Sequence, residues 1–227
     1  MNYVIAAPTP PSVEVKATND RFPVHRIYCV GRNYAAHARE MGNDSREPPF
    51  FFTKPADAVV ANNVSVPYPS RTSNFHHEVE LVVALAGGGV NIPVENANSL
   101  VFGYAVGIDL TRRDLQNTAK DSGKPWDLSK AFDRSAPLAA IHPLPSTGVL
   151  ERGRIWLKVN GKERQQGDLA DMTWKVPEII AELSTLWELA AGDLIFTGTP
   201  AGVGPLVQGD VVEAGIEGLD TLTMLIS

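Results

Sequence analysis

Two carboxylates, Glu78 and Glu80, stand two residues apart just before an apolar run, Leu81 to Val83, in the stretch FHHEVELVV. Alternate side chains of a β-strand share a face, so the two carboxylates would lie side by side. Ionised carboxylates repel each other and lose hydration when they are buried, which is unfavourable unless a cation compensates them. An edge strand with a solvated acidic face is the alternative that spacing alone leaves open.

A third acid, Asp109, ends another apolar run, VFGYAVGID. Val82 and Val83 continue the strand that begins at Glu78 with apolar residues on both faces, which favours a strand inside a sheet over one at its edge. Two glutamates and one aspartate offer only oxygen ligands, and such a set suits Mg²⁺ or Mn²⁺ better than zinc. The sequence therefore predicts one divalent cation bound by Glu78, Glu80 and Asp109.

Histidines occur beside these acids and earlier in the chain. His76 and His77 adjoin Glu78, but strand alternation lets only His76 share its face, and we interpret both as support for the site rather than as ligands. His37 and Glu40 are three residues apart, so on a helix they share a face and the carboxylate could orient the imidazole as a general base. A solvated helix face is the commoner origin of such a pair.

Two lysines and a glycine-rich stretch are further candidates. Lys130, in DLSKAFD, could hold an enolate or carboxylate oxygen near a metal, and Lys54, in FFFTKP, allows the same interpretation. A surface position is the alternative for either lysine. In TGTPAGVG, residues 197–204, the glycines permit close approach to a ligand and Thr199 could donate to an oxygen. The phosphate-loop and dinucleotide fingerprints are both missing.

Composition limits the class of protein. The chain has 227 residues, 44% of them hydrophobic, which is enough for a sizeable core. Its 26 acidic against 20 basic residues give no basic stripe, so we expect no nucleic-acid partner. The single cysteine, Cys29, excludes an internal disulfide. Neither a secretory signal nor a membrane span is evident, and we expect a soluble, cytoplasmic protein with no membrane partner.

The pattern of residues predicts a β-rich α+β fold. Residues 1–20 read as an extended N-terminal arm with one short strand, and residues 21–227 as a single catalytic domain. Asn160-Gly161 indicates a hairpin, because this pair accepts the positive φ angles of a type I′ turn. The other expected elements are strands at 13–16, 26–30, 78–85 and near the end of 100–110, and helices at 33–41 and 176–189.

Seven motifs, taken together and in this order, resemble the fumarylacetoacetate hydrolase family. They span residues 21–219 and read YCVGRNYAAHAREM, PPFFFTKP, HHEVELVV, GYAVGIDLTRRDLQ, GKPWDLSKAFD, LKVNGKERQQG and GDLIFTGTPAGVG. Within the family the chain looks most similar to the compact bacterial fumarylpyruvate hydrolases and the acylpyruvases. Their joint occurrence is far more specific than any one motif.

The resemblance implies a mixed β-sandwich roll with a few short helices, a homodimer, and one Mg²⁺ or Mn²⁺ per subunit held by the three carboxylates named above. It further implies that His37 and Glu40 form a catalytic dyad on a lid helix and that Lys130 stands beside the metal. The residues that match positions holding the substrate's carboxylate and keto oxygens are Lys54, Arg113, Gln116 and Thr199. The chain has Arg32 and Asn33 where larger members have a fourth acidic ligand, so water is expected to complete the site.

The activity implied is hydrolysis of the C3–C4 bond of 2,4-dioxo acids, with fumarylpyruvate giving fumarate and pyruvate in the catabolism of aromatic compounds. An oxaloacetate decarboxylase or a muconate-pathway isomerase could use the same metal and enolate. A non-catalytic binding protein of this fold is a further alternative. The distal carboxylate of fumarylpyruvate needs a basic partner, for which the sequence leaves several candidates open, namely Arg32, Arg39, Arg46 and Arg71.

Overall fold

The structure, a computed structural model, describes residues 3–34 and 47–227. Its centre is a six-stranded mixed sheet, in which β8 pairs antiparallel with both of its neighbours while β15 and β3 run parallel. In order across the sheet, the strands are β12 (His142–Pro143), β9 (Val101–Ile108), β8 (Val79–Leu85), β15 (Leu194–Phe196), β3 (Ile27–Gly31) and β4 (Phe50–Lys54).

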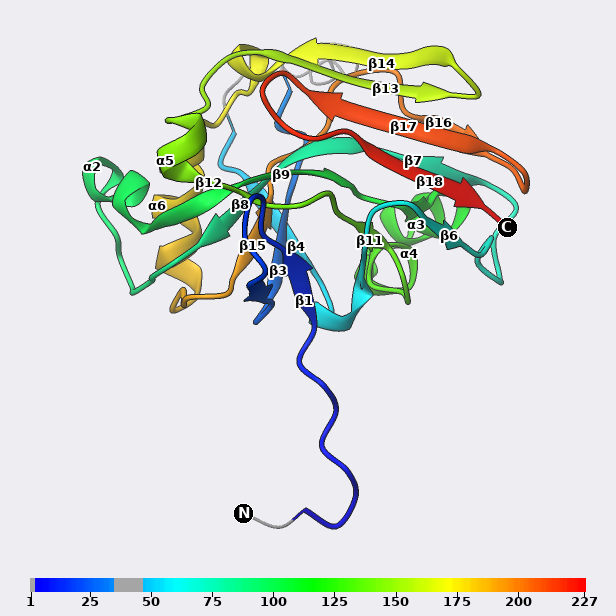
Figure 1. Cartoon of the computed structure of the whole chain (residues 1–227). Helices are drawn as coiled ribbons and strands as arrows, with labels where there is room; N and C mark the ends of the chain where they lie inside the picture. Colours follow the sequence, from blue (N-terminus) through cyan, green and yellow to red (C-terminus); the bar gives the residue numbers. More distant parts are fainter. Residues whose placement is uncertain (1–2, 35–46) are drawn as a thin grey trace.

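A five-stranded sheet packs against one face of this central sheet (Figure 1). Its strands, in order, are β14 (Lys162–Asp168), β13 (Arg154–Val159), β17 (Val211–Ile216), β18 (Leu222–Ile226) and β6 (Val64–Val66). Strand β13 contacts β8 and β17 contacts β9, so apolar side chains from both sheets fill the space between them. This sheet-rich sandwich is the fold class that the sequence predicted.

The remaining elements surround these two layers. Three small sheets are formed by β10 (Thr111–Arg112), β7 (Phe75–His77) and β16 (Gly204–Leu206), by β1 (Ser12–Glu14) and β2 (Arg21–Pro23), and by β11 (Ala136–Pro137) and β5 (Val59–Val60). Within the described ranges, the α-helices are α2 (Val94–Ala97), α3 (Arg113–Asp121), α4 (Asp127–Lys130), α5 (Leu144–Thr147) and α6 (Val176–Leu186), and the 3₁₀ turns are η1 (Ala56–Ala58), η2 (Asn98–Leu100) and η3 (Leu169–Asp171).

Strand β8 supplies two hydrophobic cores at once. All seven of its residues are buried, and successive side chains alternate between the sheet's two faces. Leu81 and Val83 belong to the larger core between the two sheets, whereas Val82 and Ala84 belong to a second core on the opposite face. A strand buried on both faces in the middle of a sheet excludes the solvated edge strand as the setting of Glu80.

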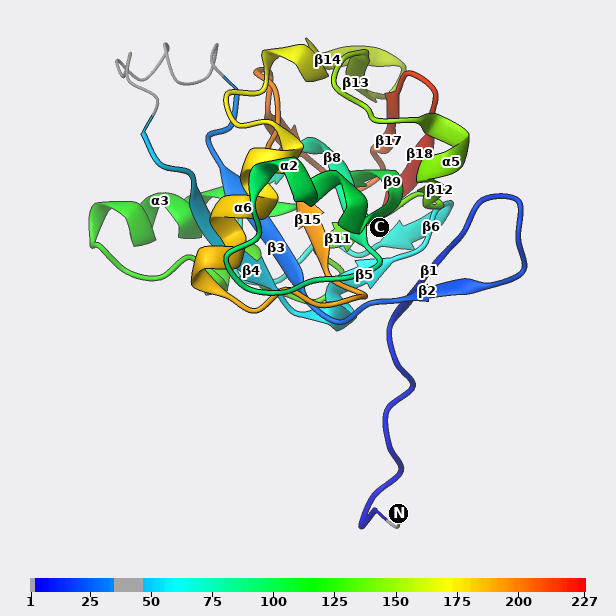
Figure 2. The ribbon, with the colours of Figure 1, turned by 90° about the vertical axis from the view of Figure 1, so that its left-hand side faces the viewer.

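The longest described helix, α6, closes the larger core (Figure 2). Its apolar face, Ile179, Ile180 and Leu183, is fully buried there. The helix begins at the predicted residue and ends three residues earlier than predicted, because Trp187 adopts an extended conformation. With 11 residues, α6 is too short to cross a bilayer, and no other helix in the described ranges is long and apolar enough.

Other sequence predictions can be checked locally. The hairpin forms where Asn160-Gly161 predicted it, with φ angles of 51° and 74° between β13 and β14. A short strand near residue 13 is present as β1, paired with β2. Most of the helix expected at 33–41, residues 35–41, lies outside the described residues. Asn33 and Tyr34 precede that gap and are not helical, since Tyr34 forms a β-bridge with Met172.

Candidate metal centre and substrate cavity

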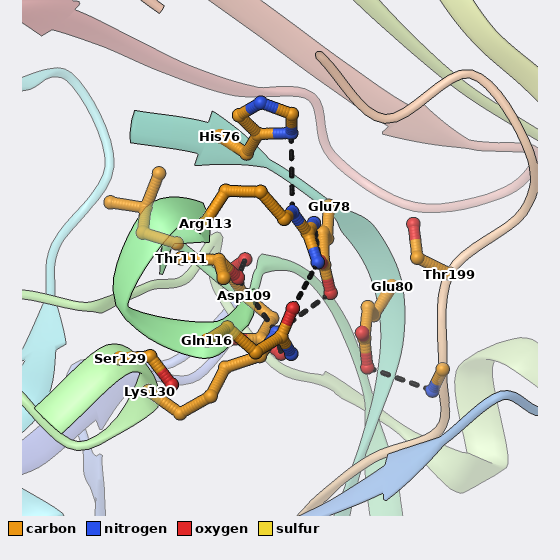
Figure 3. Close-up of polar contacts among 12 residues, drawn as sticks. His76, Glu78, Glu80, Asp109, Thr111, Arg113, Gln116, Ser129, Lys130 and Thr199 are labelled. Carbon is orange, nitrogen blue, oxygen red and sulfur yellow. Dashed lines mark hydrogen bonds and ion pairs between the residues drawn. The ribbon is translucent and has the colours of Figure 1, made fainter. Parts of the chain in front are cut away.

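Three strand ends bring the predicted carboxylates together. Glu78 lies at the junction of β7 and β8, Glu80 is the second residue of β8, and Asp109 directly follows β9. Val79 is paired with Ile108 in the antiparallel register, so the Asp109 N–H donates to the Glu78 carbonyl at 2.8 Å. One carboxylate oxygen from each acid lies within 4.8 Å of the others, and all three residues are buried (Figure 3).

Lys130, at the end of α4, reaches into this cluster. Its Nζ donates to Glu78 Oε2 at 2.9 Å, to Asp109 Oδ2 at 2.5 Å and to Thr111 Oγ1 at 2.7 Å. Burial alone would lower the pKa of Lys130, but the two carboxylates more than compensate and raise it. The ammonium is therefore charged, and three acceptors fix its position.

Arg113, the first residue of α3, contacts the cluster from the other side. Its Nη2 donates to Glu78 Oε1, its Nη1 donates to Gln116 Oε1 at 2.5 Å, and its Nε donates to His76 Nδ1 at 3.4 Å. Burial would raise the pKa of Glu78, but Lys130 and Arg113 outweigh it and hold that pKa well below its usual range. Glu78 is thus an ionised carboxylate between two cations.

Glu80 has a different environment. Its Oε2 accepts from the backbone N–H of Gly198 at 2.7 Å, and within the described residues no basic side chain forms an ion pair with it. Gly198 has φ +99°, and a Cβ there would lie 2.7 Å from the Cβ of Asn33, so the contact depends on glycine. Burial, followed by the charges of Asp109 and Glu78, raises the pKa of Glu80 well above its usual value.

These observations fit a hard divalent cation at the cluster. Glu80 is buried beside two other carboxylates, and a positive charge between them would offset both their repulsion and their lost hydration. Asp109 Oδ1 is buried without an aligned hydrogen bond, although the Lys54 ammonium lies 2.8 Å away. An all-oxygen set of this kind is the donor chemistry that Mg²⁺ and Mn²⁺ prefer.

Lys54 lies behind the cluster rather than in front of it. Its side chain is completely buried, and Nζ donates to the carbonyls of Leu110 at 3.2 Å and Lys130 at 2.5 Å. Together with its ion pair to Asp109, these contacts occupy the ammonium and connect β4 to the residues after β9 and α4. A direct contact of Lys54 with substrate stays a prediction, and the observed contacts make it a positioning residue.

Gln165, on β14, is a site residue that the sequence did not indicate. Its Oε1 accepts from the Val79 N–H at 3.1 Å and faces His77 Nδ1 at 2.9 Å, while its Nε2 donates to Thr199 Oγ1 at 2.8 Å and Pro200 O at 2.9 Å. The fully buried carboxamide therefore links the start of β8 to the loop after β15. Nothing in the charged stretch KERQQG distinguishes this glutamine from its neighbour.

The two histidines before Glu78 lie outside the carboxylate cluster, and their supporting role stays a prediction. His76 Nε2 is 2.7 Å from Asn74 Oδ1, and its Nδ1 accepts from Arg113. Burial, and then the charge of Arg113, lowers the pKa of His76 to about 4. Burial also lowers the pKa of His77. Both rings are neutral near pH 7, and they orient neighbouring groups.

A cavity of about 270 Å³ opens in front of the cluster. It brings together every described residue that the sequence assigned to the site except Lys54, namely Glu78, Glu80, Asp109, Lys130, Arg113, Gln116 and Thr199. His37 and Glu40, the predicted dyad, lie outside the described residues. The cavity thus combines a hard-cation site with fixed cationic and amide donors, which suits a small carboxylate-bearing, oxygen-rich ligand.

Comparisons with known proteins agree with this chemistry. The chain is 43% identical over 182 residues to a fumarylpyruvate hydrolase from a Ralstonia species, covering 80% of this chain and 94% of that protein. It is 42% identical over 197 residues to the mitochondrial oxaloacetate tautomerase of Homo sapiens, covering 87% and 89%. The crystal structure of fumarylpyruvate hydrolase from Pseudomonas aeruginosa with Mn²⁺ and pyruvate superposes with a TM-score of 0.96 at 49% identity, covering 99% of both chains.

The match extends to a whole family. Residues 26–226 match the family described as fumarylacetoacetate (FAA) hydrolase C-terminal. This range covers most of the chain. The buried acid cluster, the lysine beside it and the β-sandwich that positions them are all present in this range. The chain therefore belongs to the fumarylacetoacetate hydrolase family and is an enzyme of that family.

Proposed function

We propose that the protein is a metal-dependent hydrolase that cleaves the C3–C4 bond of 2,4-dioxo acids, with fumarylpyruvate as substrate and fumarate and pyruvate as products. The observation that carries this proposal is the cavity in which three buried carboxylates, Lys130 and Arg113 converge. The Pseudomonas aeruginosa relative, at 49% identity, holds Mn²⁺ and pyruvate, and pyruvate is one of the two products proposed here.

Glu78, Glu80 and Asp109 would hold the cation through one oxygen each. A bound Mg²⁺ or Mn²⁺ would supply Lewis-acid polarisation at the oxygens of an α-keto acid. Lys54 and Gly198 keep the carboxylates in place, through the contact with Asp109 and the hydrogen bond to Glu80. This arrangement is fixed before substrate arrives, as efficient electrostatic stabilisation requires.

The chain's own donors would bind and orient the dioxo acid. Arg113 is held by Glu78 and His76, so its guanidinium presents a fixed charge to a substrate carboxylate. Gln116 and Thr199 line the same cavity and offer neutral polar groups to keto oxygens. Lys130 stands where the enolate of pyruvate would form, and it would exchange one of its three present acceptors for that oxygen.

Proton transfer is assigned to His37 and Glu40. In the proposed reaction His37, oriented by Glu40, takes a proton from the water that attacks the C4 carbonyl. The C3–C4 bond then breaks, its electron pair leaves as the enolate of pyruvate, and a proton is delivered to C3. Substituting His37→Ala should reduce pyruvate release by about 10²-fold or more while Mn²⁺ binding persists.

A substrate panel tests the proposal. Pyruvate release should be measured, by a coupled assay, from fumarylpyruvate, maleylpyruvate, acetylpyruvate and oxaloacetate with Mg²⁺ and with Mn²⁺. We expect release from the 2,4-dioxo acids and none after chelation by EDTA. If the metal-loaded protein released pyruvate from none of the three 2,4-dioxo acids, the proposed hydrolysis would be overturned.

Oxaloacetate chemistry is the second candidate. It is favoured by the 42% identity to the human oxaloacetate tautomerase, because tautomerisation passes through the same kind of enolate and needs no attacking water. Two further readouts separate the candidates. Interconversion of the enol and keto forms of oxaloacetate, followed by ultraviolet absorbance, reports tautomerisation, and pyruvate release from oxaloacetate reports the decarboxylation considered above.

A further inference from the structure

One face of α3 points into the cavity. Arg113, Gln116 and Lys120 are spaced by three and four residues, so they lie along one side of the helix, and all three line the cavity. The inner two contact each other, and Arg113 also contacts the carboxylate cluster through Glu78. The helical rise places the Lys120 backbone about 6 Å further along α3 than that of Gln116. Lys120 therefore stands at the outer end of the row.

Lys120 is an exposed cation on the lining of this cavity. Within the described residues no acidic side chain pairs with it, and its Nζ lies 5.1 Å from the centre of the Trp126 ring. Trp126 lines the same cavity and restrains the lysine stem by this cation–π contact. Partial desolvation, and then the charges of Arg113 and Arg32, lower the pKa of Lys120, and the charge of Glu78 offsets part of that shift.

Arg32 lines the cavity as well. It follows β3 in a left-handed conformation, with φ +58°, which is unfavourable for a residue other than glycine. The next residue, Asn33, fixes this backbone because its Nδ2 donates to Trp174 O at 2.9 Å and Thr197 O at 2.8 Å. Like Lys120, Arg32 has no acidic partner in the described part of the chain. The backbone is thus held in a strained conformation that places at the cavity a cation with no acidic partner among the described residues.

The cavity therefore has two electrostatic zones. In the inner zone Lys130 and Arg113 are paired with the carboxylates. In the outer zone the exposed residues Lys120 and Arg32 form no ion pair with a described acidic side chain, which favours an anionic group at that end of a ligand. Of the arginines that the sequence left open, Arg71 is absent from the residues lining this cavity, and Arg39 and Arg46 lie outside the described residues.

We propose that Lys120, with Arg32 beside it, binds the distal carboxylate of the acyl group and so selects substrates that carry a second carboxylate. This subsite rests on the proposed function, because the inner zone must hold the pyruvoyl end of the same molecule. The separation of Lys120 from Gln116 along α3 is comparable with the extended length of a C4 acyl chain. Lys120 is a specificity-determining residue that the sequence did not indicate.

The test compares two substrates that differ at the distal end. Fumarylpyruvate ends in a carboxylate, whereas acetylpyruvate ends in a methyl group. Lys120→Gln should lower the ratio of kcat/KM for fumarylpyruvate to that for acetylpyruvate by about tenfold, chiefly through KM, because one charge-assisted hydrogen bond is lost. Lys120→Arg should restore most of the ratio. Arg32→Asn should lower the ratio in the same direction, since asparagine tolerates the left-handed backbone.

Lys124→Gln is the matched control. Lys124 is an exposed lysine four residues further on, and it does not line this cavity. The substitution removes the same charge from the protein as Lys120→Gln does. Its ratio should equal that of the wild type. A wild-type ratio in Lys120→Gln, or an equal loss in Lys124→Gln, would overturn the subsite.

A binding measurement keeps this outcome separate from that of the proposed reaction. Fumarate and crotonate share the same trans C4 skeleton, but crotonate has a methyl group in place of one carboxylate. Calorimetric titration of the Mn²⁺-loaded protein should show tighter binding of fumarate, and Lys120→Gln should remove that preference. If no dioxo acid released pyruvate while this preference held and depended on Lys120, the hydrolase proposal would fail and the subsite would stand. Equal affinities of the wild type for both acids would refute the subsite.

Discussion

Glu80 shows how a single carboxylate can serve binding at the expense of stability. It is buried against Glu78 and Asp109, and its described polar contact is a backbone N–H rather than a basic side chain. Replacing it by glutamine keeps the shape but removes the charge that a cation needs. Glu80→Gln should weaken Mn²⁺ binding by about 100-fold, measured by calorimetric titration. Glu95→Gln, at an exposed position on α2, should bind Mn²⁺ like the wild type. An unchanged affinity in Glu80→Gln would refute the assignment of this ligand.

The same substitution should have the opposite effect on the metal-free protein. Without a cation, Glu80 contributes repulsion toward two nearby carboxylates, and a neutral amide relieves it. In EDTA, Glu80→Gln should therefore melt about 3 °C higher than the wild type, as a gain near 1 kcal/mol gives in a chain of this length. In saturating Mn²⁺ the order should reverse. A lower melting temperature in EDTA would show that the Gly198 contact outweighs the repulsion.

Gln165 is a residue whose structural importance can be separated from that of its neighbour. Replacing it with leucine would leave the buried Val79 N–H and His77 without their present acceptor. We expect Gln165→Leu to lower the free energy of unfolding by about 2 kcal/mol in urea titrations. Gln166→Leu makes the same chemical change on the exposed side of β14 and should alter stability little. Equal effects of the two variants would contradict this role.

At the scale of elements, α3 is held in place at its first turn. Asp114 accepts hydrogen bonds from the Thr72 hydroxyl at 2.6 Å and from the N–H groups of Ser73 and Leu115, each at 2.9 Å. Burial would raise the pKa of Asp114, but these donors outweigh it and lower the pKa. The carboxylate also lies at the helix N-terminus, where negative charge is favourable. It thus ties the loop before β7 to the helix that carries Arg113.

Asp114→Asn should therefore destabilise the protein by about 1 kcal/mol at pH 7. Because the folded pKa lies below the unfolded one, the carboxylate's contribution is complete above the usual value of 3.8 and disappears as pH falls through the lower, folded value. Urea titrations at pH 7 and at successively lower pH should show the gap between the variant and the wild type closing only under acid conditions. A gap that widened under acid conditions would contradict this linkage.

Elements with a strong periodic pattern could be predicted, and polar ones could not. The hairpin at Asn160-Gly161 and helix α6 follow from turn chemistry and from apolar spacing, and both are present. Helix α3, with the sequence RDLQNTAKD, has too few apolar residues for apolar spacing to mark it as a helix. The family resemblance named Arg113 and Gln116 as substrate-binding residues, but the residue pattern did not indicate that Lys120 shares their face of the helix.

The candidate site divides in the same way. The three acids could be predicted because a carboxylate is unfavourable in a buried apolar strand, and an acidic residue within an apolar run can be recognised from the sequence alone. Gln165 could not, since its burial depends on the sheet that packs above β8 rather than on its own neighbours in the chain. Lys54 was predicted as a site residue, but only the fold shows that its ammonium is enclosed behind Asp109.

At the scale of the whole molecule, the homodimer that the family resemblance implies stays a prediction. The described surface includes exposed apolar side chains, among them Phe50 on the edge strand β4, Leu128 on α4 and Trp187 after α6. Light scattering coupled to size-exclusion chromatography should give twice the mass of the chain at micromolar concentration. A mass equal to one chain across that range would refute the dimer.

Strand β8 lies between β9 and β15 and contributes side chains to both hydrophobic cores. Its amides consequently have no route to exchange with solvent deuterium that leaves either core intact, so their protection should report the global stability of the protein. Mass-spectrometric exchange should find residues 79–85 among the slowest, and residues 50–54, on the edge strand β4, should exchange through smaller openings. Two of the proposed metal ligands, Glu78 and Glu80, thus lie on or next to the strand whose hydrogen bonds open only on global unfolding. Metal loading should slow the exchange of this strand further.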